Sequence, residues 1–268
     1  MLLSSCECRG KRSSTSSRVG SLKSSAFWSL CLAQNKLHLC SLCHEEAEQL
    51  LAYRAVTSSV EGFVQQIACC YLRHGYWFYV QGRIPPGKDP ESIDRKLISK
   101  YRIDVSESTR YRRKLNGQAN LQYIRHQATF VILATKGEHK FYAEEANLIR
   151  DIRRFPIRYA GYSISYKRGA RKKGGAPDDK WHAHVEIDRQ QYLDLRAWFL
   201  ERAHRDSATR LALAFYKLPI APYAPVRRQM LQLLKGVNQI RQETNRKPLP
   251  VEALPLRRQV VRPFGHNA

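Results

Sequence analysis

The sequence predicts an α+β fold: a small, largely antiparallel sheet, flanking helices and a helical basic C-terminal region. Short apolar or alternating stretches bounded by Gly, Pro or Asn mark the strands, for example Tyr76–Val80 and Phe130–Ala134. Longer stretches with an apolar residue every three or four positions mark helices between and after the strands. Hydrophobic residues make up 43% of the 268 residues, which is enough for a packed core.

A helix and an aromatic strand are the first elements expected. The stretch at 76–80 is aromatic and β-branched, and Pro85, Pro86 and Gly87 supply the turn that follows it. Strict alternation would put Tyr76, Phe78 and Val80 on one face and Trp77 and Tyr79 on the other. Such a strand is expected in the core, although exposed aromatic residues can also stack on bases. The helical stripe before it, within residues 44–73, consists of Leu50, Leu51, Val60, Phe63, Val64, Ile67 and Leu72.

Two capped helices are expected next. Asp89 can cap a helix over Pro90–Tyr101, because proline is favoured at the first helical position. Ser106 can cap a second helix that runs to about Leu115, where Asn116 and Gly117 end it.

The rest of the chain is expected to hold a strand, a helix, a hairpin and three more helices. Phe130–Ala134 has the apolar run of a buried strand, and a helix is expected over Ala143–Arg153. Tyr159–Lys167 and Lys180–Asp188 both alternate, which predicts a β-hairpin with a long, Gly-rich basic loop. The later helices are expected near Gln190–Arg205, Ser207–Lys217 and Pro225–Thr244.

These elements predict four regions: a disordered or mis-started Ser- and Cys-rich leader (1–45), an α+β core (46–190), a helical basic region packed on the core (191–247) and an extended basic tail (248–268). The leader contains Cys40-Ser41-Leu42-Cys43-His44, which has the haem c attachment pattern. There are two alternatives: a zinc site, and a leader that holds no site at all. The zinc ligands would be Cys31, Cys40, Cys43 and either His44 or His38.

Positive charge is the strongest functional signal. Lys and Arg total 46 against 23 Asp and Glu, a formal net charge of +23, and the last 68 residues alone hold thirteen basic and four acidic side chains. Arg outnumbers Lys by 30 to 16, and its planar fork fits phosphates and base edges. A nucleic-acid partner is therefore expected, with lipid headgroups or a ribosomal surface as alternatives. DNA is favoured over RNA, and a cytoplasmic location without a membrane span is expected.

The predicted hairpin carries the residues with the most chemistry. In a strand, His182, His184, Glu186 and Asp188 point to one side, and Trp181, Ala183, Val185 and Ile187 point to the other, into a core. Two imidazoles at i and i+2 can hold one divalent cation, with Glu186 as a possible third ligand. Phosphate contacts are expected from the basic residues of the strand ends and the loop, which are Lys167, Arg168, Arg171, Lys172, Lys173 and Lys180.

The tripeptide His182-Ala183-His184 resembles the histidine-hydrophobic-histidine (HUH-type) motif of endonucleases that start rolling-circle replication and plasmid mobilisation. The resemblance implies a Mg²⁺ or Mn²⁺ site at these His residues and a tyrosine on a nearby helix that attacks DNA. Tyr216 is the first candidate nucleophile, and Tyr223 is the second. The chain would then be a DNA-nicking enzyme of a plasmid or mobile element. The alternative is a half-exposed strand whose polar face holds histidines, in a non-catalytic DNA- or RNA-binding protein or ribonucleoprotein partner.

A second resemblance concerns the two capped helices. Lys96–Tyr101, a turn at Arg102–Val105 and Ser106–Lys114 look like a helix-turn-helix, which implies that the second helix enters the major groove. A solvated basic helix with a serine cap is the alternative. Either way, Arg110, Arg112, Arg113 and Lys114 are expected to contact phosphates. In the last helix the same is expected of Arg227 and Arg228, on a basic face that also includes Lys235 and Arg241. Walker-type, dinucleotide and serine-elbow motifs are not found, so metabolic chemistry is not expected.

Overall fold

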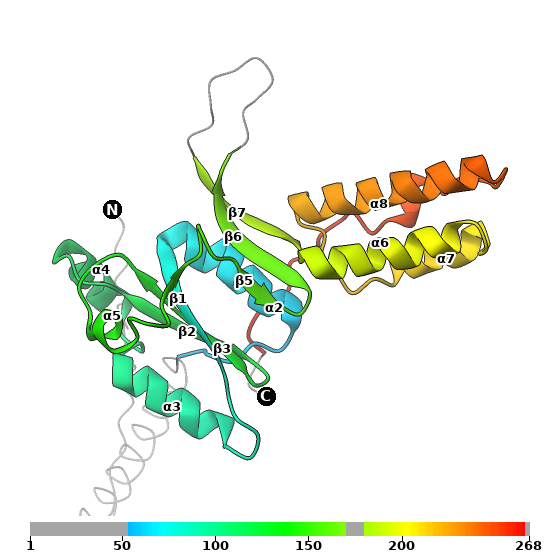
Figure 1. Ribbon diagram of the computed structural model, residues 1–268. Helices are drawn as coiled ribbons and strands as arrows, with labels where there is room; N and C mark the ends of the chain where they lie inside the picture. Colours follow the sequence, from blue (N-terminus) through cyan, green and yellow to red (C-terminus); the bar gives the residue numbers. More distant parts are fainter. Residues whose placement is uncertain (1–52, 170–179, 266–268) are drawn as a thin grey trace, which may run out of the picture. The chain divides into compact units, whose positions relative to one another are not determined.

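A computed structural model describes residues 53–169 and 180–265 (Figure 1). Within them the chain forms a four-stranded sheet, a three-stranded sheet and a set of helices, and every pair of adjacent strands is antiparallel. The predicted α+β class is confirmed, although the strands form two small sheets where the sequence predicted one.

Among the described residues, the helical segment that covers the predicted stripe begins at Val60. Helix α2 (Val60–Gln65) is capped by Ser59, whose hydroxyl accepts a hydrogen bond from the Gly62 amide, and it continues through one π-helical and one 3₁₀ turn to His74. Residues 53–59 are not helical, because Val56 forms a parallel bridge with Arg125 of the strand Leu121–His126. The Thr57 amide donates to the Arg125 carbonyl at 2.8 Å. The predicted positions 44–52, with Leu50 and Leu51, lie outside the described residues.

The larger sheet has the order β2-β3-β1-β4. Its strands are β1 (Tyr76–Arg83), β2 (Leu121–His126), β3 (Thr129–Thr135) and β4 (Arg150–Asp151). The predicted central position of β1 is confirmed, but the predicted alternation of its side chains is wrong. The register shifts between Tyr76 and Phe78, and such a bulge moves the following residues to the opposite face. Tyr76 and Tyr79 therefore join one core cluster, while Phe78 and Val80 join another.

Both faces of this sheet are covered. On one face, Phe63, Val64 and Ile67 from α2 and the π-helical turn that follows it pack between β1–β3 and the three-stranded sheet. The other face lies against α3 (Pro90–Tyr101) and α5 (Lys140–Glu144), with Tyr101 and Phe141 fully buried there. The predicted caps of α3 and of α4 (Glu107–Leu115) are confirmed: Asp89 accepts from the Glu91 and Ser92 amides, and Ser106 accepts from the Thr109 amide.

The chain between α4 and the hairpin departs most from the predictions. Strand β2 was not predicted, and the helix expected over Ala143–Arg153 is wrong. Helix α5 already ends at Glu144, and Arg150–Asp151 pairs with Tyr79 and Phe78 as the edge strand β4. Pairing with the exposed edge of β1 satisfies backbone groups that a helix would have left open, so tertiary context overrides local propensity here.

The smaller sheet contains the predicted hairpin. Its strands are β5 (Ile157–Tyr159), β6 (Tyr162–Arg168) and β7 (Trp181–Ile187), in that order. Positive φ angles at Ala160 and Gly161 make the tight turn between β5 and β6, where the sequence had suggested one continuous strand. The β6–β7 pairing confirms the predicted hairpin, and Lys167 lies opposite His182, Ser165 opposite His184 and Ser163 opposite Glu186.

The three predicted C-terminal helices are confirmed. They are α6 (Arg189–Ala203), α7 (Ala208–Tyr216) and α8 (Ala224–Glu243). They share a core that includes Phe199, Phe215 and Val237. The Gln229 side chain joins α8 to the hairpin, because its amide accepts from the Ile187 amide at 2.8 Å and donates to the Ile187 carbonyl at 3.1 Å.

After α8 the chain has little regular structure, apart from a 3₁₀ turn at Val251–Ala253, but it packs closely. Leu249 and Leu254 are buried in the helical core. Further on, the Gln65 side chain donates to the Val261 carbonyl at 2.7 Å and accepts from the Val261 amide at 3.2 Å. Residues 248–263 therefore link the helical region to α2.

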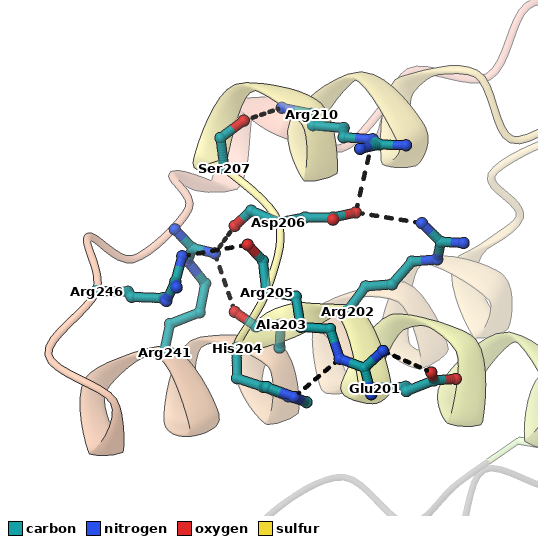
Figure 2. Close-up of polar contacts among 10 residues, drawn as sticks. All are labelled: Glu201, Arg202, Ala203, His204, Arg205, Asp206, Ser207, Arg210, Arg241 and Arg246. Carbon is teal, nitrogen blue, oxygen red and sulfur yellow. Dashed lines mark hydrogen bonds and ion pairs between the residues drawn. The ribbon is translucent and has the colours of Figure 1, made fainter.

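A buried guanidinium fixes the corner between α6 and α7 (Figure 2). Arg241 of α8 is 2% exposed, and it donates to the carbonyls of Ala203 and Asp206 at 3.0 and 2.9 Å and of Lys247 at 2.7 Å. Burial, with a contribution from Arg246, lowers its pKa. Arg241 therefore cannot belong to an exposed basic face of α8, which corrects the expectation from the sequence.

Candidate nucleic-acid interface

The distal half of the β6–β7 hairpin is the first feature of the candidate site. Strand β5 pairs only with Tyr162–Ile164, so from Ser165 onward β7 is the only described strand that pairs with β6. Near the base of the hairpin Val185 and Ile187 are buried, whereas Trp181, His182 and Ala183 are exposed. Figure 1 shows β6 and β7 extending together away from the other elements.

This geometry corrects one expectation from the sequence. The alternation of β7 predicted that Trp181, Ala183, Val185 and Ile187 all face a core, but only Val185 and Ile187 do so. Trp181 is 38% exposed, because the strands continue beyond the elements that cover their base. A two-stranded ribbon that leaves an aromatic side chain and several cations exposed gains little core burial, so its residues need another explanation.

The polar side of the hairpin contains the predicted metal ligands. His184 Nε2 lies 3.1 Å from Glu186 Oε2, and Lys167 Nζ lies 3.5 Å from Glu186 Oε1. Glu186 thus already has two partners, one of them a cation that opposes metal binding. Within residues 53–169 and 180–265, no group of three or more His, Cys, Asp or Glu side chains is placed to hold a metal ion. The metal site therefore stays a prediction.

The other side of the hairpin carries a stack of three aromatic rings, which we call the aromatic ladder: Trp77, Tyr166 and Trp181. The Trp77 and Tyr166 ring centroids are 5.9 Å apart with planes at 26°, and those of Tyr166 and Trp181 are 5.7 Å apart at 18°. The ladder joins the two sheets, since Trp77 belongs to β1 and the other two rings to the hairpin. The Trp77 indole nitrogen also donates to the Leu72 carbonyl at 3.3 Å, which holds its ring in place.

Two arginines lie against the aromatic ladder. The Arg153 guanidinium carbon is 4.8 Å from the Trp77 ring centroid and 5.9 Å from that of Trp181, and the Arg168 carbon is 5.7 Å from that of Trp181. Asp151 orients Arg153 through bonds of 2.6 to 3.0 Å. Burial alone would raise the pKa of Asp151, but the hydrogen bonds from Arg153 outweigh it and hold that pKa below its usual value.

The sequence did not identify Arg153, Tyr166 or Trp181 as site residues. The available signal was the spacing in the hairpin: with Arg168 paired to Trp181, residue 166 is the diagonal neighbour of Trp181 on the same face. Arg153 could not be found this way, because it was assigned to a helix. Arg168 shares the face of the ladder, Lys167 lies on the opposite face with Glu186, and Lys180 immediately precedes β7. All three are exposed, whereas Arg171, Lys172 and Lys173 lie outside the described residues.

The two candidate nucleophiles lie in the helical region. Tyr216, at the end of α7, is 67% exposed. Tyr223 precedes α8, and the Arg258 guanidinium carbon lies 4.8 Å from its ring centroid. Burial raises the pKa of Tyr223 to about 12. Cys69 also raises this pKa, whereas Arg258 lowers it. A phenol that resists deprotonation is a poorer nucleophile, so this environment does not activate Tyr223.

Helix α4 is the second basic surface. None of its residues is fully buried, Arg112 and Lys114 are exposed, and Arg110 and Arg113 are half-buried. Arg113 donates to the Arg102 carbonyl at 3.2 Å. Arg102 and Arg113 also line a cavity of about 370 Å³ together with Gln118, Ala119, Glu138, His139 and Lys140. Burial, Arg113 and Lys140 all lower the pKa of His139.

The remaining predicted residues lie apart from these surfaces. Arg227 and Arg228 are exposed in the first turn of α8. The haem c pattern and the candidate zinc ligands lie outside the described residues. Among the described residues, none of the helices combines the length and the apolar character needed to cross a membrane. No protein-family model matches this chain, and no curated protein matches its sequence.

Proposed function

We propose that this protein binds nucleic acid and that the distal half of the β6–β7 hairpin is its principal contact surface. The observation that carries the proposal is the group of exposed cations at the distal end of the hairpin, Lys167, Arg168 and Lys180, on a hairpin that carries the aromatic ladder on one face. The overall charge of +23 supports it, because a strongly cationic chain attracts polyanions and gains entropy when it displaces their counterions. Helix α4 and the first turn of α8 would add further phosphate contacts.

The geometry of the ribbon also supports the proposal. A two-stranded antiparallel ribbon that projects from its sheet can bring basic side chains to the phosphates of a duplex or of a single strand. Lys167 and Arg168 are adjacent at the end of β6, and Lys180 immediately precedes β7, so the three cations gather at one end of the ribbon. A plasmid or mobile-element protein that handles DNA is the setting we favour, and a ribonucleoprotein partner is the alternative.

The test is fluorescence anisotropy with a labelled DNA duplex, a DNA single strand and an RNA single strand, each titrated at several KCl concentrations. The variant K167Q/R168Q/K180Q removes three charges from the hairpin. If all three contact phosphates, the slope of log Kobs against log[salt] should become shallower by about 2 to 3, since each phosphate contact contributes about 0.7 to 0.9.

The variant K88Q/R95Q/K96Q is the matched control, because it removes the same charge from exposed residues within and just before α3. Figure 1 shows α3 and the hairpin at opposite ends of the view. If the control lowers affinity and salt slope as much as the hairpin variant does, the net charge acts and the proposed surface is wrong. If wild-type protein binds none of the three probes, nucleic-acid binding itself is wrong.

Metal-dependent DNA nicking is a second candidate, which the two histidines on one side of β7 favour. With Mn²⁺ or Mg²⁺, wild-type protein would nick supercoiled or single-stranded DNA and H182A/H184A would not. A covalent adduct on a denaturing gel would map to Tyr216 or Tyr223. Tight binding with no nick in either protein would rule out this candidate and leave a non-catalytic binding protein.

A further inference from the structure

We infer that the aromatic ladder is a stacking platform for unpaired bases, so that this surface takes single-stranded nucleic acid in preference to a duplex. The inference rests on the proposed function and specifies the substrate class of the same site. It starts from the placement of the rings: Trp77 and Tyr166 are half-buried, and Trp181 is the most exposed ring of the three.

The ladder is held in place before any ligand binds. Trp77 is fixed by its indole hydrogen bond to Leu72, and Tyr166 lies between the two tryptophans. Arg153 contacts the rings of both tryptophans and is itself oriented by Asp151. A base that stacks on a ring already ordered in this way loses less entropy than one that must order a mobile side chain.

A small, exposed residue lies beside the ladder. Ala183 lies directly opposite Tyr166 in the register and is exposed, so a small side chain occupies the position next to the rings. On the same hairpin, Val185 and Ile187 occupy the corresponding positions nearer the base and are buried. Along β7 this face thus changes from the buried Ile187 and Val185 to the exposed Ala183 and Trp181.

The chemistry selects unpaired bases. In a duplex each base is covered by its neighbours, so its flat face is not available to a tryptophan ring. A single strand offers free base faces and phosphates together. Proteins that bind single strands accordingly combine aromatic platforms with cationic grooves. Here Arg168 shares the face of the ladder, with its guanidinium carbon 5.7 Å from the Trp181 ring centroid, and Lys167 and Lys180 are exposed at the same end of the hairpin. A strand stacked on Trp181 would therefore have cations near its phosphates.

The experiment compares a labelled 15-nucleotide single strand with the corresponding 15-base-pair duplex in the same buffer. We expect W181A to weaken single-strand binding about 5- to 150-fold, the range produced by removing a stacking aromatic residue. Duplex affinity should change less than about 2-fold, and W181F should restore most of the single-strand affinity. Circular dichroism melting identifies any variant that loses its fold.

Trp198 of α6 provides a matched control. It is 40% exposed and has the Arg202 guanidinium carbon 4.4 Å from its ring centroid, but it meets Phe199 edge-on and is not part of a parallel stack. W198A should leave both affinities unchanged. Equal losses of single-strand and duplex affinity in W181A would overturn the stacking inference while leaving nucleic-acid binding intact. Absence of binding by the wild-type protein would overturn both.

Discussion

Replacing Arg241 by methionine should destabilise the protein strongly, although the sequence alone suggests a surface position. The guanidinium is 2% exposed and donates to the carbonyls of Ala203, Asp206 and Lys247, which methionine cannot do (Figure 2). Each hydrogen bond from a charged donor is worth about 1.5 to 3 kcal/mol. Burial penalises the charged guanidinium, which is why it lowers the pKa of Arg241. Methionine carries no charge and avoids this penalty, which offsets part of the loss. We expect a net cost of about 3 kcal/mol.

The assay is urea unfolding followed by circular dichroism, with thermal melting as a second measurement. A cost of about 3 kcal/mol corresponds to a fall in Tm of about 6 to 12 °C for a domain of this size. R205M is the control, because Arg205 is exposed in the same corner and makes one surface ion pair with Glu201 at 3.5 Å. It should cost less than about 0.5 kcal/mol. If R241M is as stable as R205M, the structural role assigned to Arg241 is wrong.

Three further predictions concern the core and the C-terminal segment. D94N should cost about 3 to 5 kcal/mol in urea unfolding, because it leaves Arg125, whose Nη2 lies 2.8 Å from Asp94, buried without its carboxylate, whereas D104N at an exposed site should cost almost nothing. Burial lowers the pKa of His126 below 6.5, so as pH falls the unfolded state binds the proton before the folded state does. The free energy of unfolding should therefore fall as pH drops from 6.5 through the pKa of the folded state. H126Q should lose less stability than wild type between pH 7.5 and pH 5, and an equal loss would contradict this. G62A would place a Cβ 2.8 Å from the Pro263 Cα, so limited proteolysis should cut the C-terminal segment faster, and an unchanged rate would contradict the packing described.

Local signals predicted the elements whose boundaries depend on nearby residues. Asp89 and Ser106 cap α3 and α4 as predicted, because a cap needs only a side-chain oxygen and the next turn of helix. The hairpin was equally predictable from its alternation. These elements needed no information from distant parts of the chain.

Long-range pairing decided the rest. Strand β2 was missed because Gln122, Arg125 and His126 look like surface residues, yet all three are buried. Their partners are distant in sequence: Asp94 binds Arg125, and the Tyr159 hydroxyl lies 2.6 Å from His126 Nδ1. No periodicity in the strand itself reveals such partners.

The candidate site was predicted in part. The basic residues and histidines of the hairpin were identified from the sequence, and the described ones lie together on it. The aromatic ladder was not identified, because Trp77 comes from another sheet and because alternation placed Trp181 in the core. The Trp181 ring lies at the surface because the hairpin continues beyond β5, and only the observed strand register shows this.

The most direct test of nucleic-acid binding at the hairpin is photo-crosslinking with a single-stranded oligonucleotide that carries 5-iodouracil, followed by peptide mapping. This base crosslinks to aromatic side chains that it stacks on. We expect crosslinked peptides that contain Tyr166 or Trp181, and loss of the Trp181 crosslink in W181A. Crosslinks confined to peptides from α4, α8 or the C-terminal segment would contradict it.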